Sequence, residues 1–184
     1  MTNLDHFKYI RRCIEIADEA VAAGNHPFGA LIVDKEGNII VESGNIEVTE
    51  KECTGHAETT AMRKAVKLYS REFLWDCTLY STAEPCCMCT GAIYWGNVGR
   101  IVYGISEKDL LALTGADEDN PTFDMPCREI LAKGQKPIEV IGPIADEELA
   151  KEIARAHIGY WNKSERRSYN FDNKDQKSLQ IYHK

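Results

Sequence analysis

Two short motifs in this 184-residue chain contain side chains that could bind a metal. The motifs are His56-Ala57-Glu58 and Pro85-Cys86-Cys87-Met88-Cys89. One histidine and two cysteine thiolates are typical zinc ligands, and a catalytic zinc site takes three ligands from the protein and leaves the fourth position to water. We therefore predict that His56, Cys86 and Cys89 bind Zn2+.

Glu58 is better suited to carry protons than to bind the metal. It stands two residues after His56, and at the start of a helix both side chains can reach one small site. Zinc lowers the pKa of a bound water to about 7, and a neighbouring carboxylate can take that proton and release it elsewhere. The motifs thus predict hydrolysis with Glu58 as the catalytic residue. A structural zinc site, the alternative, normally has a fourth protein ligand.

Both motifs are expected at the start of helices. Residues His56–Leu68 are rich in strong helix formers, and Cys86–Trp95 follows directly after a proline. Cys86 and Cys89 are three positions apart, so one helical turn brings them to the same side. The N-terminus of a helix also favours the thiolate form of cysteine. We therefore expect two helix starts to converge on the metal.

The rest of the pattern alternates helices and strands, which predicts a three-layer α/β/α sandwich around a five-stranded mixed sheet. Residues 105–137 are expected to be irregular apart from one short helix. We expect one domain over residues 1–162 and a polar tail over 163–184 that could close over the site as a lid. The further predicted elements are helices at Asp5–Ala23, Arg128–Ala132 and Asp146–Trp161, a hairpin turning at 35–38, and strands at Cys77–Ser81, Arg100–Gly104 and Ile138–Ile141.

Composition restricts the partners. No apolar run approaches the roughly 20 residues that cross a bilayer, and the first residues show no signal-peptide pattern, so we expect a cytoplasmic protein without a membrane partner. The net charge is −7, and residues 163–184 hold six Lys or Arg against three Asp or Glu, so the rest of the chain is acidic. Because nucleic-acid affinity depends on basic residues, nucleic acid is disfavoured as a partner.

The combination His-x-Glu and Pro-Cys-x-x-Cys resembles the motif pair of zinc deaminases. Together with PFGALIV at 27–33, Asn45 and EPCCMCTGAIYW at 84–95, the chain resembles the cytidine deaminase superfamily. Within it, the chain is most similar to the branch of nucleobase and tRNA-adenosine deaminases, and to guanine deaminase in particular. The resemblance implies a cytidine deaminase-like fold, a homodimer, and release of ammonia from a small nucleobase-type substrate, guanine or a similar aminopurine.

The resemblance also implies substrate contacts. Asn45 matches an asparagine that hydrogen-bonds the base, and Asp124 matches an acid tied to purine binding or proton shuttling. Phe28 and Trp95 could stack on the base, although such residues are more often part of the core. The predicted substrate-binding residues are Asn45, Ala57, Phe28, Glu84, Asp124 and Trp95.

Two other functions fit the motifs. A tRNA adenosine deaminase would share them, but it needs a basic track for its RNA. A catalytically inactive, zinc-stabilised binding protein would keep the metal ligands but would have no use for Glu58. The segment Cys89–Ile93 also resembles fungal-type cytosine deaminases, and residues 106–137, which would shape the pocket mouth, differ from the guanine deaminase pattern. The sequence therefore leaves the base open.

Overall fold

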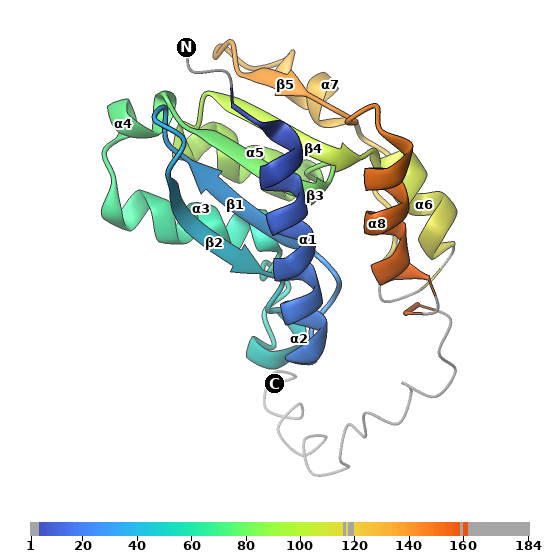
Figure 1. Ribbon diagram of the computed structural model, residues 1–184. Coiled ribbons are helices and arrows are strands. Elements are labelled where there is room, and N and C mark those ends of the chain that lie inside the picture. The colour runs from blue at the N-terminus through green and yellow to red at the C-terminus, as the bar shows by residue number, and fades with distance from the viewer. Residues whose placement is uncertain (1–3, 116, 118–119, 159, 162–184) are drawn as a thin grey trace, which may run out of the picture.

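A five-stranded mixed sheet forms the centre of the computed structural model, which describes residues 4–115, 117, 120–158 and 160–161. The strand order is β2-β1-β3-β4-β5, with helices on both faces (Figure 1). This confirms the predicted α/β/α sandwich. The strands are β1 (Gly29–Val33), β2 (Ile39–Gly44), β3 (Thr78–Ala83), β4 (Arg100–Ile105) and β5 (Glu139–Ile141).

Two long helices cover each face of the sheet (Figure 1). Helices α1 (His6–Ala22) and α8 (Glu147–His157) pack on one face, and α3 (Ala57–Leu68) and α5 (Cys87–Gly96) pack on the other. Among the shorter helices, α6 contacts α8 and α7 contacts α5. The shorter helices are α2 (Glu47–Glu50), α4 (Arg71–Trp75), α6 (Glu107–Thr114) and α7 (Cys127–Leu131).

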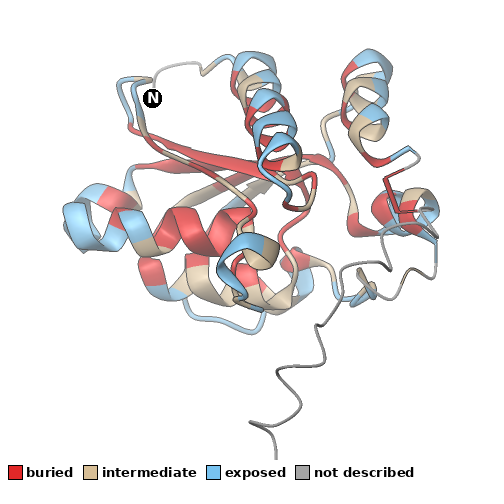
Figure 2. Ribbon diagram, turned by 90° about the horizontal axis from the view of Figure 1, so that it is seen from below, coloured by how far each residue is buried: buried red, intermediate tan, exposed pale blue. Residues whose placement is uncertain are grey.

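The hydrophobic core consists of two clusters, one on each face of the sheet. Leu31 and Val102 belong to the cluster beneath α1 and α8, whereas their chain neighbours Ile32 and Ile101 belong to the cluster beneath α3 and α5. Successive side chains of a strand point to opposite faces, so strands buried on both faces must be apolar at nearly every position. Figure 2 shows these buried strands between helices whose outer sides are exposed.

The strand directions bring several segments to one edge of the sheet. Strands β3 and β4 are parallel, while β1 is antiparallel to β3 and pairs Ala30 with Ser81. The carboxyl ends of β3 and β4 therefore lie beside the start of β1. In open α/β sheets, ligands bind outside the carboxyl ends of the strands. The Pro85–Cys89 motif follows β3 at this edge, and Phe28 precedes β1 there.

Helix α6 lies in the stretch that was predicted to be irregular. Its cap explains the difference: Ser106 Oγ accepts the backbone N–H of Asp109, and the Asp109 carboxylate accepts the backbone N–H of Ser106. This capping box uses aspartate where glutamate or glutamine is usual. Helix α4 was also missed, and α8 ends at His157 instead of Trp161.

The predicted tail, residues 163–184, and its role as a lid lie outside the described residues. The proposed domain boundary near residue 162 therefore stays a prediction. Within the described part of the chain, no helix has the length and apolar character that spanning a membrane requires.

Candidate metal centre and active site

Two helix starts bring three soft ligand atoms together. His56 is the N-cap residue of α3, Cys86 is the N-cap residue of α5, and Cys89 lies in the first turn of α5. The ligand atoms of these three residues all lie within 4.8 Å of one another. Among the described residues, this is the group of His, Cys, Asp and Glu side chains that is compact enough to hold one metal ion.

The spacing of these atoms fits a zinc ion. His56 Nδ1 lies 3.6 Å from Cys86 Sγ and 3.6 Å from Cys89 Sγ. A tetrahedral centre with Zn–S distances of about 2.3 Å and a Zn–N distance of about 2.0 Å has an S···N edge of about 3.6 Å. One imidazole and two thiols at this spacing form three corners of such a tetrahedron, and the fourth corner is left for water.

The shifted pKa values favour a Cys86 thiolate beside a protonated His56, and a neutral Cys89 thiol. A hydrogen bond from Cys89 lowers the pKa of Cys86 to about 4, and His56 contributes in the same direction. The bond to Cys86, together with burial, raises the pKa of Cys89. Burial lowers the pKa of His56, but hydrogen bonds with Cys86 and Glu47 outweigh it and raise this pKa to about 11. Metal binding at this site must therefore release protons.

Glu58 lies beside the same group on the first turn of α3. Its side chain is buried, Ser81 Oγ donates a hydrogen bond to Oε1 at 2.8 Å, and Oε2 lies 3.4 Å from Cys89 Sγ. Burial raises the pKa of Glu58, and the positive charge of His56 opposes that shift. A carboxyl group held in this way is suited to exchanging a proton with a molecule bound at the metal group.

The group formed by His56, Cys86 and Cys89 borders a cavity of about 220 Å³ at the carboxyl ends of β3 and β4. Three acidic side chains, from Glu58, Glu84 and Glu107, line it. The remaining lining residues are Phe28, Cys53, His56, Ala83, Cys86, Cys87, Met88, Leu110, Asn120, Pro121 and Phe123. A cavity of this size, acidic and partly apolar, matches a small heterocycle better than a phosphate-bearing ligand.

Sequence reasoning missed Glu107 and Asn120. Glu107 is the first residue of α6 and is 8% exposed; burial raises the pKa of Glu107 to about 7, and the negative charge of Cys86 adds to the shift. Asn120 Nδ2 is buried and has no hydrogen-bond partner among the described residues. Both lie in the stretch predicted to be irregular. The Ser106–Asp109 capping box was the one sequence signal that could have placed Glu107.

Two of the predicted substrate residues line the cavity. Phe28 lies there with its ring edge-on to His157, at a centroid distance of 5.3 Å. The Glu84 carboxylate lines the cavity as well, but both of its oxygens already accept backbone N–H groups, from Cys127 at 2.9 Å and Glu107 at 3.2 Å. Glu84 therefore fastens α6 and α7 around the cavity.

The other four predicted residues are not among those that line the cavity. Asn45 is buried, and its amide forms hydrogen bonds with Glu47. Ala57 is buried at the start of α3. Asp124 is exposed, next to the lining residue Phe123. Trp95 is 73% exposed near the end of α5 and lines a separate groove between α3 and α5.

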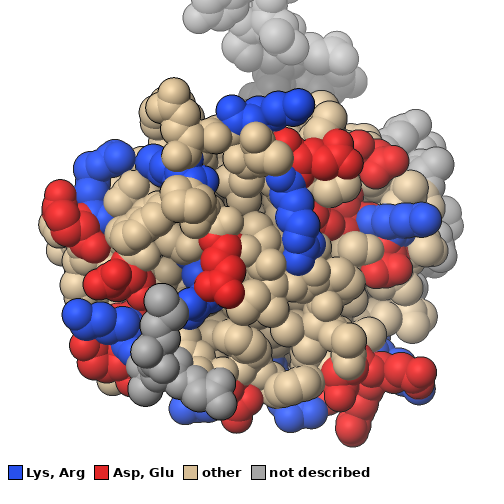
Figure 3. All heavy atoms as spheres, turned by 90° about the horizontal axis from the view of Figure 1, so that it is seen from above, with Lys and Arg blue, Asp and Glu red and all other residues tan. Residues whose placement is uncertain are grey.

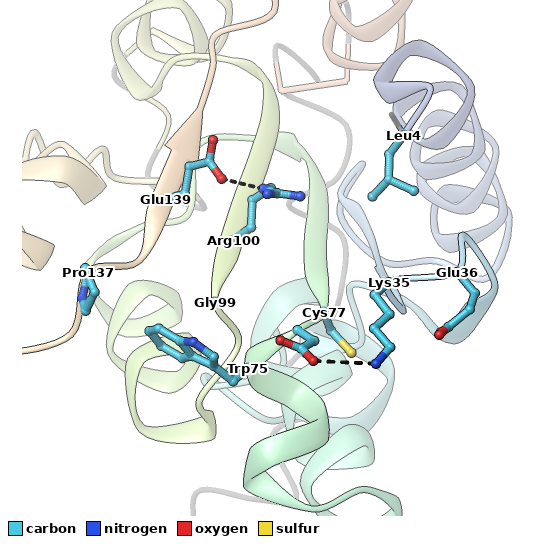
Figure 4. Close-up of a pocket in the computed structure, with 10 residues that line it drawn as sticks. Leu4, Lys35, Glu36, Trp75, Cys77, Gly99, Arg100, Pro137 and Glu139 are labelled. Atoms are coloured by element: carbon cyan, nitrogen blue, oxygen red, sulfur yellow. Dashed lines mark hydrogen bonds and ion pairs between the residues drawn. The ribbon is translucent and has the colours of Figure 1, made fainter. Parts of the chain in front are cut away.

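A larger cavity, of about 770 Å³, lies at the opposite edge of the sheet, where β3 and β4 begin (Figure 4). Four of its charged side chains form two ion pairs, Lys35 with Asp76 at 3.9 Å and Arg100 with Glu139 at 2.7 Å. Among the described residues that line it, Cys77 is the one cysteine or histidine, and burial raises the pKa of its thiol to about 12. The smaller cavity, with its ligand group and buried acids, is therefore the candidate active site.

Comparison with known proteins points to one family. A family described as the cytidine and deoxycytidylate deaminase zinc-binding region matches residues 4–105. The probable cytosine deaminase of Schizosaccharomyces pombe is 38% identical over 154 residues, which cover 84% of this chain and 91% of that protein. The tRNA-specific adenosine deaminase of Haemophilus influenzae is 42% identical over 100 residues, 54% of this chain and 58% of that protein.

The guanine deaminase of Bacillus subtilis is 44% identical over 129 residues, covering 68% of this chain and 81% of that protein. A crystal structure of guanine deaminase from the same organism superposes with a TM-score of 0.56 at 36% identity, covering 70% of this chain and 90% of that one. These relatives are all named as deaminases, but their names give three different substrates, namely cytosine, guanine and adenosine in tRNA.

Proposed function

Because this chain belongs to the cytidine and deoxycytidylate deaminase family and is a zinc-dependent hydrolytic deaminase, we propose that it deaminates guanine or a similar free aminopurine. One observation carries the proposal. His56 and Cys86, two members of the ligand group, line the same small cavity as the buried Glu58 carboxyl, so a metal, a proton carrier and a flat heterocycle can meet there.

In the proposed reaction, His56, Cys86 and Cys89 would hold a zinc ion, which would supply an activated water molecule as the nucleophile. Glu58 takes a proton from the water and delivers it to the ring nitrogen next to the amine-bearing carbon. The water oxygen forms a C–O bond at that carbon and keeps its second proton as a hydroxyl group. Glu58 moves this second proton to the amine, the C–N bond breaks to release ammonia, and the hydroxyl oxygen becomes the carbonyl of the product. Ser81 keeps one oxygen of Glu58 in place throughout.

Two residues of the cavity favour a base that has a carbonyl beside a ring N–H. Asn120 Nδ2 is a buried donor without an acceptor among the described residues, and the Glu107 carboxylate is an acceptor for N–H groups. Guanine presents such a C=O and N–H pair, whereas adenine has no carbonyl. We assign these two residues to the edge of the base, and Phe28 to its ring face.

Cytosine is the second candidate, because the Schizosaccharomyces pombe relative covers more of the chain than the guanine deaminase does, and cytosine also carries a carbonyl beside a ring N–H. A tRNA substrate is disfavoured by charge. On the face shown in Figure 3, Lys and Arg are interspersed with Asp and Glu rather than gathered into a track, and the cavity itself is acidic.

The test is ammonia release by the purified protein, with guanine, cytosine, adenine, guanosine and a tRNA anticodon stem-loop as substrates. Turnover of guanine is expected, with kcat lower by about 10²- to 10⁴-fold in Glu58→Gln and unchanged zinc content. Turnover of cytosine alone would establish the second candidate. Activity only on the stem-loop, or wild-type turnover in Glu58→Gln, would overturn the proposal.

A further inference from the structure

The second ring nitrogen of His56 faces a carboxylate. His56 points Nδ1 at the two cysteine sulfurs, and its Nε2 lies 3.6 Å from Oε2 of Glu47, the first residue of α2. The side chains of His56 and Glu47 are only 33% and 24% exposed, so solvent screens their interaction incompletely. A metal-bound histidine commonly donates its other N–H to a carboxylate or a carbonyl.

The loop between β2 and α3 is built to bring Glu47 to this position. Asn45 Nδ2 donates to Glu47 Oε2, the same oxygen that faces His56, and the backbone N–H of Glu47 donates to Asn45 Oδ1 at 3.0 Å. The backbone N–H of Ile46 donates to the carbonyl of Gly55, the residue before His56, at 2.8 Å. The carboxylate is therefore fixed by its own loop before any metal binds.

Gly55 permits this approach. A Cβ added at Gly55 would lie 2.8 Å from the carbonyl oxygen of Glu52, and 3.0 Å and 3.1 Å from the backbone nitrogen and Cα of Glu47. These are backbone atoms, which cannot move aside as a flexible side chain can. The absence of a side chain at this position thus lets the segment before His56 pack directly on the segment that carries Glu47.

We propose that Glu47 is a positioning residue that holds His56 with its ring proton on Nε2, so that the Nδ1 lone pair faces the metal. This inference rests on the proposed function, because it assumes that Nδ1 binds zinc. Only one of the two imidazole nitrogens carries the proton in the neutral ring, so fixing the proton on Nε2 prepares Nδ1 as the ligand. Nothing in the sequence motifs indicated this role.

The test measures zinc affinity directly, by competition with a chromophoric chelator in the absence of substrate. Glu47→Ala removes the acceptor, and we expect zinc to bind about 10- to 100-fold more weakly. Glu47→Gln keeps an oxygen but loses the charge; since charge-assisted hydrogen bonds are about twice as strong as neutral ones, a smaller loss of about 3- to 10-fold is expected. Glu50→Ala, which removes the same charge from an exposed position on α2, is the matched control.

A second readout separates positioning from general loop stability. In zinc-loaded protein, nitrogen-15 NMR should detect the Nε2–H proton of His56 in the wild type and in Glu47→Gln, and the proton should exchange too fast to detect in Glu47→Ala. Wild-type affinity in both Glu47 variants, an equal loss in Glu50→Ala, or a wild-type ring protonated on Nδ1 would overturn the inference. A wild type that binds no zinc would instead contradict the proposed function.

Discussion

The three acidic side chains that line the cavity differ in their hydrogen-bond partners. Glu58 and Glu84 both line the cavity. The hydroxyl of Ser81 donates a hydrogen bond to one oxygen of Glu58, whereas both oxygens of Glu84 accept backbone N–H groups. Glu107 is the remaining acid, and the raised pKa of its carboxyl follows first from burial. In the proposed function, Glu58 is the proton carrier and Glu107 contacts the ligand, whereas Glu84 is structural.

The role of Glu107 predicts the kinetics of Glu107→Gln. Above pH 7 the Glu107 carboxyl is mostly ionised. A glutamine keeps the shape but loses this charge, which accepts a ring N–H, and a hydrogen bond to a charged group is worth about 1.5–3 kcal/mol. We expect kcat/KM for guanine to fall by roughly 10- to 100-fold with zinc content unchanged. Glu129→Gln, an exposed glutamate of α7, is the control for charge. Steady-state kinetics equal to wild type would remove Glu107 from the substrate site.

At the scale of elements, the two helices that start at the motifs were predictable from sequence. Proline before Cys86 and helix formers after His56 indicate where α5 and α3 begin, and the spacing of Cys86 and Cys89 fixes their common side. Helix α6 was not predicted, because its capping box has aspartate in place of the usual glutamate or glutamine. In addition, α6 packs against α8, a contact between distant parts of the chain. Contacts such as Glu47 with His56 depend on how the loop folds, which no local pattern specifies.

The packing of α1 on β1 predicts a steric effect at Gly29. A Cβ there would lie 2.1 Å from the Cys13 carbonyl oxygen and 2.8 Å from the Ala17 backbone nitrogen, both in the backbone of α1. Overpacking of this kind costs about 1–3 kcal/mol, so Gly29→Ala should lower the free energy of unfolding by that amount. The measurement is urea denaturation followed by circular dichroism.

Gly91 provides the matched control for this substitution. A Cβ at Gly91, inside α5, meets nothing within 4 Å, and alanine is the better helix former, so Gly91→Ala should stabilise the fold by up to about 1 kcal/mol. Equal stability of Gly29→Ala and wild type would contradict the tight contact between α1 and β1.

At the scale of the whole molecule, an aromatic cluster at the end of α8 packs against Phe28, one of the residues that line the cavity. His157 is buried between Phe28, a lining residue of the cavity, and Trp161, whose Nε1 donates to His157 Nδ1 at 3.1 Å. His157 Nε2 has no hydrogen-bond partner within the described ranges. Because Nδ1 accepts the bond from Trp161, the neutral ring carries its proton on Nε2, and protonation would place a second hydrogen on Nδ1, against the Trp161 donor. Burial of the ring lowers the pKa of His157 to about 4.

This lowered pKa makes stability depend on pH. The unfolded chain takes up the proton near pH 6.5, but the folded chain does so only near pH 4, so the contribution is complete above pH 6.5 and is lost as the pH falls toward 4. Between pH 7 and pH 5 the loss should be about 2 kcal/mol. Urea denaturation should show this loss in the wild type and not in His157→Gln. The same pH dependence in both proteins would exclude His157 as its source.

Assembly and location stay predictions at this scale. The homodimer implied by the resemblance would have the exposed Trp95 and Val66 available on α5 and α3, where they line one groove. The interspersed charges on the face shown in Figure 3 and the acidic cavity are the observations behind our proposal of a small neutral substrate. The cytoplasmic location stays an expectation from composition.

X-ray absorption at the zinc edge of the purified protein tests the central claim most directly, that His56, Cys86 and Cys89 form a three-ligand zinc centre with one position left for water. The expected spectrum has two sulfur neighbours at about 2.3 Å and two lighter neighbours at about 2.0–2.1 Å, one from histidine and one from water. Three or four sulfur neighbours would instead mean that Cys87 or Cys53 completes the site. Such a centre would be closed and structural, which would contradict hydrolysis at this metal.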